Sequence, residues 1–145
     1  MASRKDIVAR ARWYVAKKTP FIHQQRQNHG VDCVGLVLCV AQDLKLTDIT
    51  GRPFLRSDYP IYQGFNAQQE GYKRFIRKLR TELLPGDVVI MRCPIEACHF
   101  GIISERKGVL YLINAINTGK FTAIEHILDF KWQRRITDAL SFPGV

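Results

Sequence analysis

The first half of the chain repeats apolar residues at the three- and four-residue spacing of a helix that buries one face. A first helix is predicted over residues 3–18, because Ser3 and Asp6 form a capping-box pair and Thr19-Pro20 ends the pattern. Its apolar stripe consists of Ile7, Val8, Ala11, Tyr14 and Val15. A further helix is predicted to begin at Asn66, with a basic outer face and with Tyr72, Phe75, Ile76 and Leu79 facing inward.

Between these two helices, residues 33–44 are apolar on more than one side, which is typical of a buried central helix. Asp32 is its expected N-cap, so Cys33 falls in the first turn. Unpaired backbone N–H groups and the positive end of the helix dipole favour a thiolate there, which makes Cys33 a candidate nucleophile. The alternative for Cys33, and the interpretation we adopt for Cys39 in mid-helix, is a small buried apolar residue.

After the turn signal Leu84-Pro85-Gly86-Asp87, the pattern changes to the alternation of strands. Strands are predicted at residues 88–92, 99–104, 109–114, 121–126 and 134–142. Helices followed by a strand meander predict an α+β fold, with N-terminal helices packed on a C-terminal antiparallel sheet of about five strands. At 145 residues, of which 46% are hydrophobic, the whole chain 1–145 is expected to form one domain.

Two segments between the predicted helices are candidates for the walls of a site. Residues 21–30 are polar and lead directly into the Cys33 helix. Residues 45–65 are too long and too aromatic for a simple connection, so their aromatic side chains either line a groove or pack on the core. These aromatic residues are Phe54, Tyr59, Tyr62 and Phe65.

A thiolate nucleophile needs a base, and the strand pattern favours His99 among the four histidines. If Glu105 lies opposite Gly108 in the hairpin, Asn114 lies opposite His99 on the same face. An asparagine oxygen at that spacing can accept a proton from the imidazole and leave the other ring nitrogen to Cys33. Cysteine, histidine and asparagine in these roles form an acyl-transfer triad.

The same register assigns side chains to the two faces of the sheet. The face of His99 also carries Gly101, Ile103, Leu110 and Leu112, and we expect the Cys33 helix to pack there. Phe100, Ile102, Val109, Tyr111 and Ile113 would then point the other way. That second face would bind another protein unless the first helix covers it.

Composition narrows the setting in which the chain works. No apolar run approaches the length of about 18 residues that spans a bilayer, so we expect a chain made and folded in a cytoplasm. Its four cysteines lack the spacing of a secreted disulfide scaffold. The net charge of +9 favours an anionic partner such as a cell-wall polymer, nucleic acid or an acidic protein.

Four motifs resemble the NlpC family of papain-like cell-wall peptidases: GVDCVGL at residues 30–36, LLPGDVVI at 83–90, HFGII at 99–103 and LINA at 112–115. TPFIHQ at 19–24 and WQRRI at 132–136 resemble the branch found in tailed-phage tail proteins. The resemblance implies hydrolysis of peptidoglycan stem peptides, commonly between D-glutamate and diaminopimelate, with Cys33, His99 and Asn114 as the triad and no cofactor. It places the chain in the virion tail, beside other tail proteins, and its activity at the bacterial cell wall.

The resemblance also implies that Phe21, His23 and Asp32 contact the substrate. Many relatives carry a tyrosine twelve residues before the cysteine, where this chain has Phe21. The hydroxyl that helps to hold the substrate carbonyl is therefore absent. His23 or the backbone N–H groups at Cys33 would have to replace it.

Three other functions stay open at this point. Cys93, Cys98 and His99, completed by Cys33 or His23, could hold a metal or a cluster. The chain could be a structural tail component with a weak or silent peptidase site. Nucleic-acid binding is disfavoured, because the basic helix face lacks interleaved aromatic residues.

Overall fold

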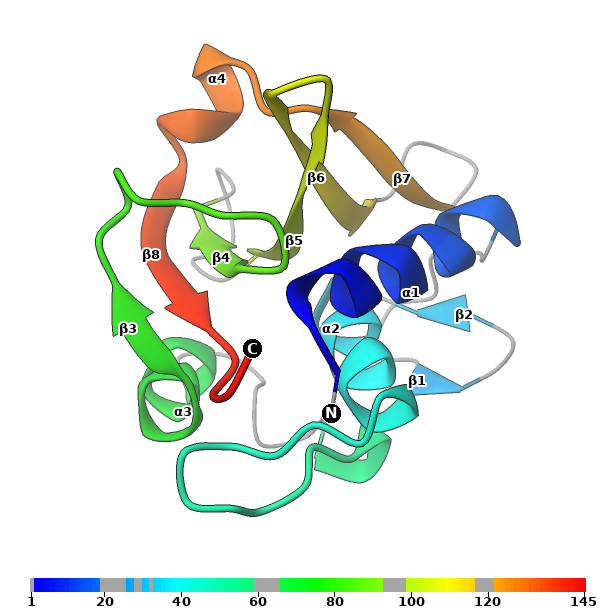
Figure 1. Cartoon of the computed structure of the whole chain (residues 1–145), viewed down its shortest axis with the longest axis vertical. Helices are drawn as coiled ribbons and strands as arrows, with labels where there is room; N and C mark the ends of the chain where they lie inside the picture. The colour runs from blue at the N-terminus through cyan, green and yellow to red at the C-terminus, as the bar shows by residue number, and fades with distance from the viewer. Residues whose placement is uncertain are drawn as a thin grey trace.

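The structure is a computed structural model that describes residues 2–18, 26–27, 30–31, 33–58, 66–92, 99–116 and 122–145. The helices are α1 (Arg4–Ala16), α2 (Cys33–Asp43), α3 (Asn66–Arg74) and α4 (Phe130–Gln133). The strands are β1 (Arg26–Gln27), β2 (Gly30–Val31), β3 (Ile76–Lys78), β4 (Val88–Met91), β5 (His99–Arg106), β6 (Val109–Ile116), β7 (Thr122–Ile127) and β8 (Ile136–Ser141). The predicted α+β class is confirmed (Figure 1).

The main sheet is antiparallel, with the strand order β3-β8-β4-β5-β6-β7. It has six strands, where the sequence predicted about five, because residues 76–78 form β3 at one edge. The prediction that Ile76 and Leu79 face inward on a helix is wrong, because α3 ends at Arg74. The side chains of Ile76 and Leu79 are 48% and 64% exposed. Pairing with β8 outweighs the local helical pattern here. A two-stranded ribbon, β1–β2, overlaps the polar segment 21–30, for which no strand was predicted.

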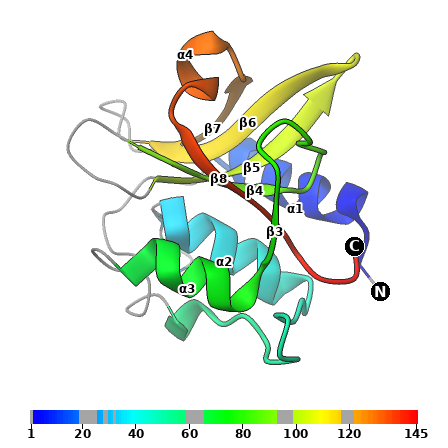
Figure 2. The same cartoon turned by 90° about the vertical axis from the view of Figure 1, so that its left-hand side faces the viewer.

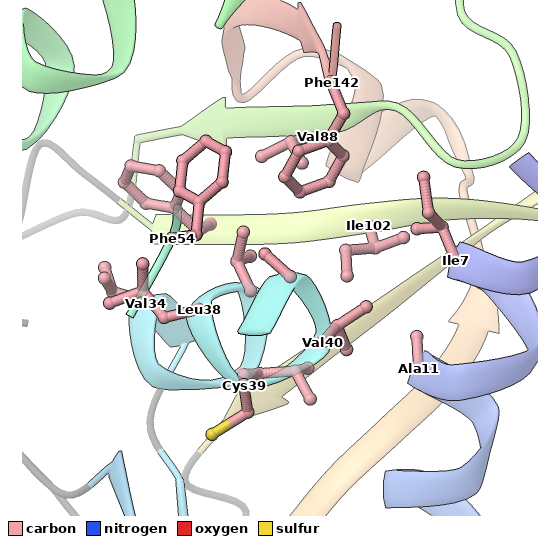
Figure 3. Close-up of a cluster of buried hydrophobic side chains, with 14 of the residues drawn as sticks. Ile7, Ala11, Val34, Leu38, Cys39, Val40, Phe54, Val88, Ile102 and Phe142 are labelled. Carbon is pink, nitrogen blue, oxygen red and sulfur yellow. The ribbon is translucent and has the colours of Figure 1, made fainter. Parts of the chain in front are cut away.

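One face of the sheet carries the larger core and two helices. The capping box at Ser3 and Asp6 begins α1 as predicted, and Ile7 and Ala11 are fully buried. α2 packs against β5 and β6, while α1 lies across β5, β6 and β7. Figure 3 shows side chains of α2, α1 and the strands meeting in this core. No helix in the described part of the chain is both long and apolar enough to span a membrane.

The face on which α2 packs is the opposite of the predicted one. Phe100, Ile102 and Ile113 belong to the core beneath α1 and α2, whereas Ile103 and Leu112 belong to a second cluster on the other side. That second side is covered by residues near α4, and Figure 2 shows α2 and α4 on opposite sides of the sheet. Phe100, Ile102 and Ile113 are at most 1% exposed, so they form no docking surface. Of the other two residues predicted on that face, Tyr111 is half-buried and Val109 is exposed near the hairpin turn. The alternative that α1 helps to cover this face is the correct one.

The β5–β6 hairpin differs from the predicted register by two residues. Arg106 pairs with Val109, so the turn residues are Lys107 and Gly108, both with positive φ (52° and 80°). This is the geometry of the two-residue hairpin turns whose twist matches that of the strands, and glycine adopts it at little cost. The same register places Asn114 diagonally from His99. A shift of two residues preserves the face of each side chain, so the prediction that His99 and Asn114 share a face is confirmed.

Arg74, the last residue of α3, anchors the segment that follows α2. Its guanidinium is 2.7 Å from Asp48 Oδ2 and 2.9 Å from Asp58 Oδ2, and it also donates to the carbonyl oxygen of Pro53. Phe54 lies beneath it, 1% exposed and packed on Phe142. Of the two alternatives for the aromatic residues of segment 45–65, lining a groove or packing on the core, Phe54 follows the second. Tyr59, Tyr62 and Phe65 lie outside the described residues.

The Asp48 carboxylate takes part in this anchor as an ion. Burial raises the pKa of Asp48, but hydrogen bonds from Thr50 and Arg74 outweigh that effect and bring the pKa to about 2. A carboxyl group whose pKa is lower in the folded than in the unfolded state stabilises the fold above its unfolded pKa of about 3.9. The contribution is lost as the pH falls towards 2.

We predict that Arg74→Met lowers the free energy of unfolding at pH 7 by about 3 to 5 kcal/mol, because it leaves two buried carboxylates without their cation. Urea denaturation measures the change. Lys73→Met is the matched control, since Lys73 is 69% exposed and its ion pair with Glu70 lies on the surface. The difference between wild type and Arg74→Met should shrink as the pH falls from about 4 to about 2. Equal effects of the two substitutions would contradict this account.

Candidate active site

Cys33 is the first residue of α2, as the sequence predicted. Its side chain is half-buried and packs against the edge of the larger core. The next residue, Val34, lines a narrow gap between α2 and the sheet together with Phe100, the residue that follows His99. The beginnings of α2 and β5 therefore lie at the same end of the structure, and Figure 2 shows this arrangement.

His99 and Asn114 form a direct hydrogen bond. His99 Nε2 is 2.8 Å from Asn114 Oδ1, the His99 side chain is nearly buried, and Asn114 is fully buried. An amide oxygen can only accept, so Nε2 carries the hydrogen and donates it. In the neutral ring, Nδ1 then carries the lone pair and can act as a base. The predicted pairing of these two residues is confirmed.

His126 extends this contact by one more residue. Asn114 Nδ2 is 3.0 Å from His126 Nε2, and His126 Nδ1 is 3.0 Å from the carbonyl oxygen of Ile127. Since the carbonyl oxygen can only accept, His126 Nδ1 donates to it and Nε2 accepts from the amide of Asn114. The sequence placed a strand at His126 but gave it no role at the site.

Trp132, in α4, covers the two histidines. Its ring centroid is 4.6 Å from that of His126 and 6.1 Å from that of His99. The Arg135 guanidinium lies 5.0 Å from the ring centroid of Trp132. A ring in this position restricts the orientation of both imidazoles.

The sequence pattern did not predict α4, because residues 129–133 lie between the strands predicted at 121–126 and 134–142 and were assigned no element. A signal was present: Asp129 caps the helix by accepting from the backbone N–H of Trp132. The period-two alternation of β7 also places His126 on one face with Ile124. Neither signal reveals that His126 meets Asn114 or that Trp132 meets the two histidines.

Close packing of the sheet leaves the His99–Asn114 pair little freedom. Gly101 lies two residues after His99, and a Cβ built there would be 2.5 Å from Leu112 Cδ1 and 3.3 Å from the carbonyl oxygen of Ile113. The absence of a side chain at Gly101 thus lets Leu112 pack directly over β5. Leu112 is fully buried and lies on the same face as His99.

Several predicted site residues lie outside the described part of the chain. Phe21, His23 and Asp32, the expected substrate contacts, are among them, and so are Cys93 and Cys98 of the alternative metal site. Within the residues that the structure describes, no group of three or more histidine, cysteine or acidic side chains could hold a metal ion.

No protein-family model matches the sequence, and a comparison with curated proteins gives no match either. Solved structures, however, share the fold. The NlpC/p60 domain of the peptidoglycan hydrolase SagA aligns with 97% of this chain and 100% of its own length, with a TM-score of 0.62 and 19% identity. An NlpC/p60 family protein from Bacillus cereus aligns with 97% of this chain at a TM-score of 0.66 and 13% identity.

A third similar structure is an N-acetylmuramoyl-L-alanine amidase from Bacteroides uniformis, with a TM-score of 0.55, 12% identity and coverage of 97% of this chain and 99% of the other. The chain spans only 40% of the Bacillus cereus protein but the full SagA domain. At identities below 20%, these alignments establish a shared fold. The prediction of an NlpC-type α+β architecture is therefore confirmed.

The two described cysteines should differ sharply in reactivity. Burial raises the pKa of the Cys39 thiol, which is 1% exposed, whereas Cys33 is half-buried at a helix start. In a Cys93→Ser, Cys98→Ser background, we predict that iodoacetamide at pH 8 modifies Cys33 at least roughly tenfold faster than Cys39. Peptide mapping by mass spectrometry measures both rates, and the chain unfolded in urea is the control, in which the rates converge. Faster modification of Cys39 in the folded chain would refute the assignment of Cys33.

Proposed function

We propose that this chain is a cysteine peptidase that hydrolyses stem peptides of peptidoglycan, with Cys33, His99 and Asn114 as its catalytic triad. The observation that carries the proposal is the buried hydrogen bond from His99 to Asn114, which leaves His99 Nδ1 as a base. Cys33 begins α2 at the same end of the structure. A cysteine at a helix start and an oriented imidazole are the two parts that thiol acyl transfer needs.

In the proposed reaction, His99 Nδ1 takes the proton of the Cys33 thiol, and the thiolate attacks the carbonyl carbon of the scissile amide. Backbone N–H groups at the start of α2 stabilise the oxyanion that forms. His99 then gives its proton to the leaving amine, and a thioester remains on Cys33. Water, activated by the same imidazole, hydrolyses the thioester and restores the thiol. Phe21, His23 and Asp32 are the residues that we propose contact the substrate.

The shared fold supports peptidoglycan as the substrate, because the similar structures include a peptidoglycan hydrolase and an N-acetylmuramoyl-L-alanine amidase. The resemblance of the motifs around Cys33 and His99 to the NlpC family favours the bond between D-glutamate and diaminopimelate. Cleavage between the sugar lactyl group and L-alanine is the second candidate, suggested by the amidase structure.

Defined stem peptides test the reaction and the bond together. We predict that L-Ala-D-Glu-diaminopimelate is cleaved to L-Ala-D-Glu and free diaminopimelate, as detected by mass spectrometry. A muramoyl peptide offered in parallel reports amidase cleavage instead. Cys33→Ser should lower turnover by at least about 100-fold, and Cys39→Ser, a change in the helix interior, is the matched control. Unchanged turnover in Cys33→Ser would exclude Cys33 as the nucleophile.

We further propose that the chain acts from a phage tail at the bacterial cell wall, next to other tail proteins, and helps the genome to enter. The motifs at residues 19–24 and 132–136 support this role, and the charge of +9 suits a polyanionic wall. The alternative is a structural tail component whose site is weak or silent. Both versions place the chain in the particle but differ in what Cys33 contributes.

Particles that carry Cys33→Ser separate the two versions. If the chain is a tail-borne hydrolase, we predict normal particle yield and tail length, with genome entry at least about tenfold slower than in wild type. Electron microscopy and infection kinetics measure these quantities. If entry is unchanged and only deletion of the chain reduces assembly, the structural alternative is correct. Absence of the chain from purified particles, as judged by mass spectrometry, would contradict both versions.

A further inference from the structure

The side-chain amide of Asn114 has two ends of similar shape and opposite hydrogen-bonding character. Its oxygen accepts, whereas its nitrogen carries two hydrogens and donates. Rotation by half a turn exchanges the ends without changing the packing. Only the orientation with Oδ1 towards His99 leaves the hydrogen on His99 Nε2 and the lone pair on Nδ1.

The reversed orientation would disable the base. Asn114 Nδ2 would then point at His99 Nε2, which would have to accept, and the ring hydrogen would move to Nδ1. A neutral imidazole that carries its hydrogen on Nδ1 cannot take the proton of Cys33 through that atom. Because Asn114 is fully buried, solvent does not select between the two orientations. Another protein group must do so.

His126 is placed to make this selection. The backbone carbonyl oxygen of Ile127 accepts from His126 Nδ1 at 3.0 Å, and this fixes the ring hydrogen on Nδ1. His126 Nε2 therefore presents a lone pair, 3.0 Å from Asn114 Nδ2. If the amide were reversed, the lone pairs of Asn114 Oδ1 and His126 Nε2 would face each other there, and the buried amide oxygen would lose its hydrogen-bond donor.

Trp132 holds the selecting ring in place. Its centroid is 4.6 Å from that of His126, with the two rings tilted by 42°. His126 lies on β7 directly opposite Leu112 of β6, which is fully buried. The imidazole is thus held between a backbone carbonyl, an indole ring and the packed face of the sheet.

We propose that His126 is a positioning residue that fixes the polarity of Asn114 and thereby sets the protonation pattern of His99. A single direction of hydrogen donation runs from His99 Nε2 to Asn114 Oδ1, and from Asn114 Nδ2 through His126 to the carbonyl oxygen of Ile127. The contribution of His126 to catalysis rests on the proposed function. Its effect on the ring hydrogen of His99 does not.

The first measurement reads the ring of His99 directly, without substrate. Nitrogen-15 NMR at a pH where His99 is neutral should show the hydrogen on Nε2 in wild type. His126→Phe keeps an aromatic ring beside Trp132 but has no acceptor, so a substantial fraction of the hydrogen should move to Nδ1. His126→Gln supplies an acceptor and should restore the wild-type pattern. If His126→Phe does not fold, His126→Leu provides the same comparison. An unchanged pattern in the variant that lacks an acceptor would overturn the proposal.

The second measurement uses turnover of the stem peptide. We expect His126→Phe to lower kcat by about 10- to 100-fold with little change in KM, and His126→Gln to recover most of the loss. Asn114→Asp provides the decisive background, because either oxygen of a carboxylate can accept from His99 and there is no polarity to fix. In that background, His126→Phe should cost less than about threefold. An equal loss in both backgrounds would mean that His126 acts through packing alone, which contradicts the proposal.

The two measurements separate the proposals from each other. A chain that is inactive on every stem peptide, but whose His99 hydrogen moves as described, refutes the peptidase function and supports the positioning role. If the chain is active, but His126→Phe changes neither its turnover nor the position of the His99 ring hydrogen, the peptidase function is supported and the positioning role is refuted.

Discussion

The buried hydrogen bond between His99 and Asn114 is the interaction on which the candidate site depends. It requires two neighbouring strands in a register that places both side chains on one face, and a hairpin turn that holds the register. Lys107 and Gly108 supply that turn with positive φ angles. The geometry of a surface turn thus determines which groups meet near the far end of the same two strands.

The two faces of the sheet have separate tasks. One face is occupied by α1 and α2, whose burial supplies most of the apolar core. The other face carries the smaller cluster and, at the beginning of β5, the imidazole of His99 with its partners. Cys33 belongs to the first side and His99 to the second. A site built from both must lie at the end of the sheet, where α2 and β5 begin.

Polar contacts beside Trp132 show how a series of hydrogen bonds can fix the orientation of an otherwise ambiguous side-chain amide. The hydrogen bonds run in series from His99 through Asn114 and His126 to Ile127. The direction of each is determined, because the last acceptor is a backbone carbonyl oxygen, which cannot donate. A network with every member satisfied is rigid as well as specific. Trp132 adds to both properties because its ring lies against the two imidazoles.

The sequence by itself determined the α+β class, the capped first helix, the helix start at Cys33 and the pairing of His99 with Asn114. These features depend on local spacing: helical and strand periods are intrinsic to the backbone, and a register error of two residues leaves every side chain on its face. Only the tertiary structure decided which face α2 covers, because apolar residues such as Phe100 and Ile103 occur on both sides of β5. It alone ended α3 at Arg74, where two buried carboxylates hold the guanidinium. It also brought His126 to Asn114 and Trp132 to the two histidines, since contacts between residues distant in sequence are fixed by the packing of the whole chain.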